Sequence, residues 1–173
     1  MTTYYGGMGV GEGFNPATSY TVSTSTPEYP GAPVAVGTHL HGSDGSTWVL
    51  CVAGGSITAN DAVLVTTNSS WTVQAMTSTL AKGKLGQRAG IAGATATSGQ
   101  YLWVQTAGYN SSVNAVTGAT AFTVLHSSAT AGRLTATAVG GTSAAVTGIV
   151  ILATAASNTA AAFITGAAIG ADD

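Results

Sequence analysis

Short apolar runs rich in β-branched and aromatic residues follow one another along most of this chain, separated by turn residues such as Gly, Asn and Ser. Runs of this kind predict β-strands, and no stretch before the C-terminal segment has the period of an amphipathic helix. The expected strands span residues 47–52, 62–67, 71–76, 100–106, 122–126, 134–139 and 147–154. Strands that recur this often between turns indicate an all-β domain, built as an antiparallel β-sandwich or barrel.

The expected strand at residues 100–106 carries large side chains on both faces. Successive side chains of a strand point to opposite sides, so Leu102 and Val104 share one face while Tyr101 and Trp103 share the other. If the aliphatic face packs in the core, the aromatic face is open to a partner, since Tyr and Trp are enriched at protein interfaces. We therefore predict Tyr101 and Trp103 as partner contacts. The alternative is a central strand buried on both faces.

The last run, SNTAAAFITGAAIG, fits two structures. It can begin a short helix capped by Ser157 or Asn158, because both residue types cap helices well. It can equally form a final strand, and the sequence leaves both open.

Residues 1–33 differ in composition from residues 34–173, which form the expected β-domain. The first segment holds all four prolines of the chain. Proline fixes its own φ and favours an extended preceding residue, so we expect an extended arm that can reach on the order of 100 Å. Its spaced aromatic residues are predicted partner contacts: Tyr4, Tyr5, Phe14, Tyr20 and Tyr29. The alternatives are a tail without a partner and an arm folded back on its own domain.

Charged residues make up only 6% of the chain, where about 25% is typical, and the net charge is −2. The polar surface must therefore come from hydroxyls, amides and backbone, and such a surface is easily desolvated against another protein. So little positive charge predicts no nucleic-acid partner and no anionic membrane partner. The apolar residues 146–169 are broken by polar ones, which argues against a membrane-spanning helix.

The single cysteine, Cys51, lies inside an apolar run and excludes an internal disulfide. No neighbour in sequence would lower its pKa, so we expect a buried, unreactive thiol.

The sequence THLHGSD places His39 and His41 on one side of an extended segment, with Asp44 nearby. Two such imidazoles are candidate metal ligands, within one chain or shared about a threefold axis of an assembly. Surface or structural histidines are the simpler interpretation. With few carboxylates and no nucleophile or phosphate-loop motif, we expect no catalytic residue, no cofactor and no enzymatic activity.

The run GIAGATATSGQYLWVQTAG at residues 90–108 resembles small capsid proteins encoded beside the major head protein of tailed bacteriophages. The later runs AGRLTATAVGG and TGIVILATAASNTAAAFI are similar to the same group, and the resemblance covers residues 34–166.

This resemblance implies a capsid decoration, or cement, protein. Such a protein is a homotrimer on the outer surface of the phage head, part of the virion, and it braces neighbouring copies of the major capsid protein. The alternative is a glycan- or receptor-binding head fibre domain whose Tyr and Trp residues stack on sugars. A third possibility is a metal enzyme that uses His39, His41 and Asp44.

Overall fold

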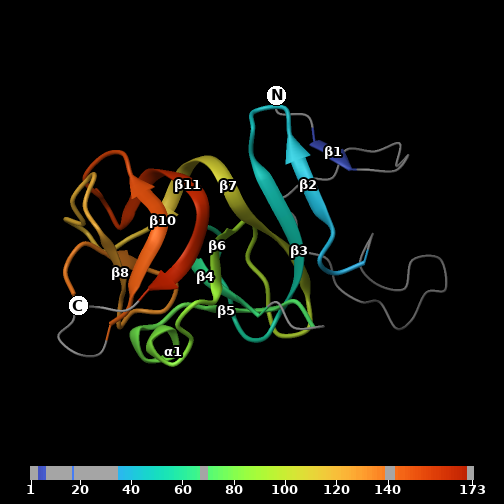
Figure 1. The fold of residues 1–173 in the computed structure, drawn as a ribbon, viewed down its shortest axis with the longest axis horizontal. Helices are drawn as coiled ribbons and strands as arrows, with labels where there is room; N and C mark the ends of the chain where they lie inside the picture. The colour runs from blue at the N-terminus through green and yellow to red at the C-terminus, as the bar shows by residue number, and fades with distance from the viewer. Residues whose placement is uncertain (1–3, 7–16, 18–34, 67–69, 139–142, 171–173) are drawn as a thin grey trace.

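The computed structural model describes residues 4–6, 17, 35–66, 70–138 and 143–170, and they form eleven strands and one short helix (Figure 1). The predicted all-β class is confirmed. The elements are β1 (Tyr4–Gly6), β2 (His39–Gly42), β3 (Thr47–Ala53), β4 (Ala62–Thr66), β5 (Thr72–Ala75), α1 (Ser78–Lys82), β6 (Arg88–Ala92), β7 (Tyr101–Asn114), β8 (Leu125–Ser127), β9 (Leu134–Thr135), β10 (Ala145–Ile151) and β11 (Thr159–Gly170).

Five of the strands pair in a closed ring, in the order β3, β5, β4, β6, β7 and back to β3. Four of these pairings are antiparallel, but β3 and β5 run parallel, with Val52 opposite Thr72. The expectation of a purely antiparallel sheet is therefore wrong at this pairing. The reason is geometric, because strand directions that alternate around an odd number of strands cannot match where the ring closes.

The long strand β7 connects this ring to the rest of the sheet. Its first half pairs with β3 and β6, and its second half pairs with β11, which continues to β10, β8 and β9. Gly108 lies where the partner changes, with φ +99°, and a Cβ there would be 2.7 Å from Cα of Ser46. Asn110 and Ser111 are of residue types that favour turns, but they do not end the strand, because pairing with β11 carries it on to Asn114.

A buried side chain of β7 stabilises the bend where the strand changes its pairing partner. Gln105 is 1% exposed, and its Nε2 donates to the carbonyl oxygens of Ala107 at 3.1 Å and Tyr109 at 2.9 Å. Its Oε1 accepts from Nδ2 of Asn110 at 2.7 Å. The glutamine therefore satisfies backbone groups that leave the regular ladder at the bend.

The C-terminal run is a strand rather than a helix. Ser157 and Asn158 have φ values of 50° and 66°, and they connect β10 to β11 as a two-residue turn between Ala156 and Thr159. Positive φ at both central residues is typical of the tight turns that join antiparallel strands. The two residues considered as helix caps instead reverse the chain.

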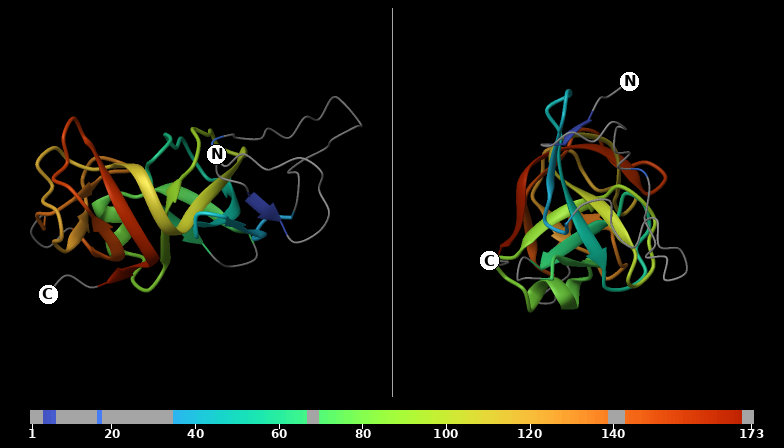
Figure 2. Two further views of the ribbon diagram at one scale, coloured as in Figure 1. Left: turned by 90° about the horizontal axis from the view of Figure 1, so that it is seen from above. Right: turned by 90° about the vertical axis from the view of Figure 1, so that its right-hand side faces the viewer.

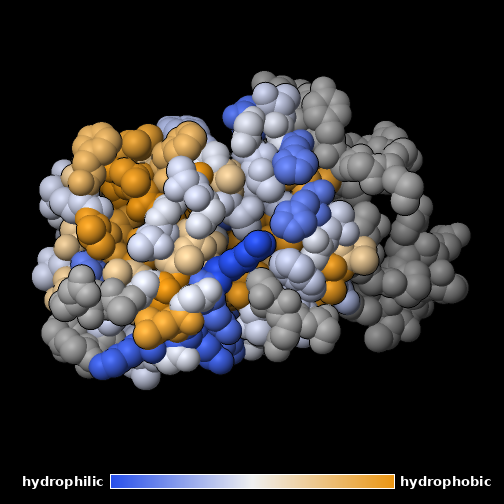
Figure 3. All heavy atoms as spheres, in the orientation of Figure 1, coloured by the Kyte–Doolittle hydropathy of each residue, from blue (hydrophilic) through white to orange (hydrophobic). Residues whose placement is uncertain are grey.

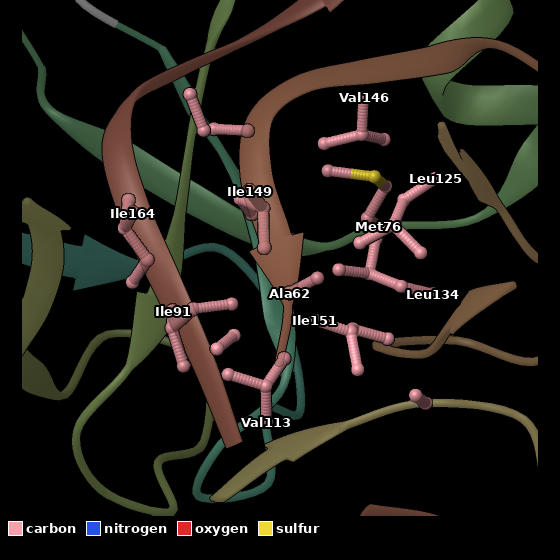
Figure 4. Packing of buried hydrophobic residues seen from close by; sticks show 14 of the residues in the cluster. Ala62, Met76, Ile91, Val113, Leu125, Leu134, Val146, Ile149, Ile151 and Ile164 are labelled. Carbon is pink, nitrogen blue, oxygen red and sulfur yellow. The ribbon is translucent and has the colours of Figure 1, made fainter. Parts of the chain in front are cut away.

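The core contains two large apolar clusters, one where the outer strands pack against the ring and one inside the ring. The largest cluster joins Ile149 and Ile151 of β10 with Ile164 of β11, Ile91 of β6 and Leu125 of β8 (Figure 4).

A second cluster fills the ring and includes Cys51, Val63 and Leu102. The Cys51 thiol is free and fully buried, as expected, and burial raises its pKa to about 12.

The hairpin of β2 and β3 lies at one end of the long axis, and β8 and β10 lie toward the other (Figure 2). No helix of the described residues is long and apolar enough to cross a membrane.

Candidate functional site

The aromatic face predicted for β7 is largely covered by the chain itself. Trp103 is 0% exposed and packs with Leu40 of β2 and with Trp48 and Leu50 of β3, while Tyr101 is partly buried at the edge of this cluster. The expectation that Trp103 meets a partner on an open face is wrong, because Trp103 is fully buried and packs with side chains of the neighbouring strands β2 and β3. The alternative, a central strand buried on both sides, is what the structure has.

The predicted contacts of the N-terminal segment fall mostly outside the described residues. Tyr4 and Tyr5 belong to β1, whose backbone pairs antiparallel with β2 of the same chain, with Tyr5 opposite His41. Phe14, Tyr20 and Tyr29 lie outside the described residues, so their contacts stay predictions.

The two candidate metal ligands flank a buried residue of β2. His39 and His41 are exposed, whereas Leu40 between them is 1% exposed. The ring of His39 meets Trp71 edge-on, with 6.1 Å between ring centroids, and Nδ1 of His41 is 3.3 Å from Oγ1 of Thr47. Partial burial, together with the positive charges of Arg88 and His41, lowers the pKa of His39.

Asp44 stabilises the turn that joins β2 to β3. Its Oδ1 accepts hydrogen bonds from N of Ser46 at 3.0 Å and from Oγ of Ser46 at 2.6 Å, and that hydroxyl accepts from Nε1 of Trp48 at 3.0 Å. In residues 35–66, 70–138 and 143–170, no group of three or more His, Cys, Asp and Glu side chains is arranged to hold a metal ion.

The most prominent exposed feature is an apolar surface at the end of the molecule opposite the β2–β3 hairpin. We call it the β10 face. Its six large side chains are Tyr109, Phe122, Val124, Val150, Leu152 and Phe163. Three of them form a row across neighbouring strands, because Phe163 of β11 lies opposite both Tyr109 of β7 and Val150 of β10. Figure 3 shows hydrophobic surface gathered over this end of the molecule.

A groove crosses the β10 face. Residues 122–125 run beside residues 146–150 and border an open cavity of about 310 Å³. N of Phe122 donates to the carbonyl oxygen of Ile151 at 3.0 Å, which ties this segment to the end of β10. None of the residues that line the groove is charged, so the groove presents an apolar surface with backbone and threonine groups.

Phe122 stands out on this face by its backbone as well as by its exposure. It is 73% exposed and has φ +55°, in the left-handed region. Bulky residues rarely adopt this conformation, which costs roughly 1–2 kcal/mol relative to glycine. An exposed aromatic side chain in this conformation contributes little to the fold that Gly or Asn would not, so it points to a role outside the fold.

Sequence reasoning missed the β10 face, although one signal for it exists. The run IVIL at residues 149–152 is apolar at every position, so alternation puts aliphatic side chains on both sides of the strand. Ile149 and Ile151 are buried in the core, and Val150 and Leu152 are left on the outer side.

Comparison with known proteins found no matching family model, no similar curated protein and no similar solved structure.

Proposed function

We propose that this protein is a structural component of a tailed-phage head, a decoration protein on the outside of the shell that braces neighbouring copies of the major capsid protein. The observation that carries the proposal is Phe122, an exposed aromatic residue in a strained conformation on an uncharged apolar face. The resemblance of residues 90–108 to small phage capsid proteins supplies the class of partner.

The β10 face suits a contact that is repeated many times. Its six side chains expose on the order of 500 Å² of largely apolar surface. This area is toward the upper end of the range for the largest apolar patch of a monomeric protein. At about 25 cal/mol per Å², burial of this area gives roughly 12 kcal/mol before the costs of association are subtracted. A contact that is weak for one copy becomes strong when copies also bind one another, so a homotrimer is part of the proposal.

The direct test is co-sedimentation of the purified full chain with assembled heads that lack it. Saturable binding, with a fixed number of copies per head, is the expected result. Removal of residues 1–33 tests the arm separately: we expect the shortened chain to remain folded and to bind heads more weakly. A full chain that stays in the supernatant at every concentration contradicts the proposal.

A glycan- or receptor-binding head fibre domain is the second candidate, and the exposed rings of Tyr109 and Phe163 favour it, because aromatic rings stack on sugars. A glycan array with the purified protein distinguishes the two proposals. Binding to a defined sugar, lost in Tyr109→Ala, supports the fibre domain, and no binding to any sugar removes it.

A further inference from the structure

A second cavity lies where β3, β6, β7 and β11 meet, and its Ala168 is the register partner of Thr147, which lines the groove of the β10 face. Its volume is about 380 Å³, and its polar lining consists of Thr47, Arg88 and Thr106. The remaining walls are alanine and glycine residues of β6, β7 and β11.

The cavity forms because β6, β7 and β11 diverge at this point. β6 and β11 share a single residue pair, Arg88 with Ala168, and β7 passes from β6 at Gln105 to β11 at Ala107. Small side chains line the place where the three strands diverge, so a cavity is left at the surface.

Arg88 is the only charged residue that lines this cavity, and its guanidinium forms no ion pair with any residue of the described ranges. Imidazoles lie close by, because His41 contacts Thr47 at the rim, and His39 is near enough for the positive charges of Arg88 and His41 to lower its pKa. Arg88 therefore lines the opening, His41 lies at its rim, and His39 is within electrostatic reach of both.

Neither of the two described carboxylates lines this cavity. Asp44 accepts the hydrogen bonds of the β2–β3 turn. Asp61 accepts from N of Thr58 at 2.8 Å and from Nδ2 of Asn114 at 2.9 Å.

We propose that this cavity binds a carboxylate, held by the guanidinium of Arg88 and the hydroxyl of Thr47. Guanidinium and carboxylate form two parallel hydrogen bonds, and the hydroxyl can accept from His41 while it donates to the ligand. Walls of Ala and Gly fit a carboxylate on a short apolar stem, such as an acidic side chain. This inference does not depend on the proposed function.

The carboxylate can come from this chain or from another molecule. Four of the six acidic side chains of the chain, Glu12, Glu28, Asp172 and Asp173, lie outside the described residues, while all four basic side chains lie within them. The experiment must therefore separate an internal carboxylate from an external one.

The test is an NMR titration of the full chain with propionate, with propionamide as the uncharged control of the same shape. We expect saturable shifts of the Thr47, Ala107 and Ala168 amides, with a dissociation constant on the order of millimolar, and no response to propionamide. The pKa of His39 should rise at saturation, because a bound anion offsets the charge of Arg88. Arg88→Gln should weaken binding at least tenfold, and Lys84→Gln, which removes the same charge outside the cavity, should leave binding unchanged.

A second titration uses the variant Glu12→Gln, Glu28→Gln, Asp172→Asn, Asp173→Asn. Saturable binding by this variant alone supports the site and shows that a carboxylate of the chain occupies it in the unmodified protein. Equal saturable binding by both proteins supports the site with an external ligand. No saturable response in either protein, or an equal response in Arg88→Gln, overturns the inference.

Discussion

Tyr109 of β7 and Phe163 of β11 lie directly opposite each other, and both rings are on the outer side of the sheet, 54% and 45% exposed. Val150 extends this row to β10, and Ile149 and Ile151 on the other side of that strand are buried in the core. The strands at this end of the molecule are thus apolar on both sides although only one side is covered by the described fold. A second covering layer is what the proposed function supplies.

The substitution Phe122→Asn should leave the free energy of unfolding unchanged or raise it by up to about 1 kcal/mol. Asparagine adopts the left-handed conformation more readily than phenylalanine, and little buried surface is lost because Phe122 is 73% exposed. Urea unfolding followed by circular dichroism measures the change. A decrease of more than about 2 kcal/mol in the free energy of unfolding would show that Phe122 stabilises the fold, and would remove the main support for the proposed function.

Gln105→Leu should destabilise the fold by about 3 kcal/mol. The variant keeps the size of the side chain but leaves the carbonyls of Ala107 and Tyr109 and the amide of Asn110 without their buried partner. Gln74→Leu on the exposed side of β5 is the matched control and should change the stability by less than about 0.5 kcal/mol. Equal effects of the two substitutions would show that Gln105 does not hold the bend of β7.

A comparison of Gly132→Ala with Gly99→Ala separates two costs to stability, that of a side chain at positive φ and that of steric overlap with a neighbour. The two glycines have similar positive φ values, 75° and 85°, but a Cβ at Gly132 would overlap the carboxylate of Asp61, whereas a Cβ at Gly99 would point into open space. Gly99→Ala should therefore cost about 1 kcal/mol, and Gly132→Ala should cost at least about 2 kcal/mol more. Thermal unfolding of both variants measures the difference, and equal costs would contradict the close contact with Asp61.

Stability should decrease as the pH falls below 6.5, in part through His39. Its pKa is lower in the fold than the ordinary value of 6.5, so the unfolded chain takes up a proton first, and the contribution of His39 is present above pH 6.5 and lost below it. Urea unfolding over this pH range should show a smaller decrease for His39→Gln, and also for Arg88→Gln, which removes one cause of the lowered pKa. Identical pH profiles for all three proteins would contradict this assignment.

Much of the fold is predictable from local patterns, because β3, β4 and β5 coincide closely with runs of β-branched residues bounded by turns. The strand β6, with the sequence RAGIA, escapes such reasoning, since its only β-branched residue is Ile91 and its place is set by pairing with β4 and β7. Of the strand expected at residues 134–139, the described part, residues 134–138, is a strand only over Leu134–Thr135, where it pairs with β8.

The candidate functional surface is harder to predict, because exposure depends on which elements cover a face. Trp103 has the character of an interface residue, but it is fully buried in a cluster with Leu40, Trp48 and Leu50. Val150 and Phe163 have the character of core residues, yet among the described elements nothing covers their side of the sheet. Alternation within one strand shows that two faces exist but does not tell which of them receives a covering layer.

Binding of the double variant Phe122→Asn, Phe163→Thr to assembled phage heads tests the β10 face most directly. The wild-type protein and Leu85→Asn, which removes an exposed apolar side chain outside this face, serve as references. We predict that the double variant remains folded and binds heads at least tenfold more weakly, while Leu85→Asn binds as the wild type does. Equal binding of all three proteins would contradict the account.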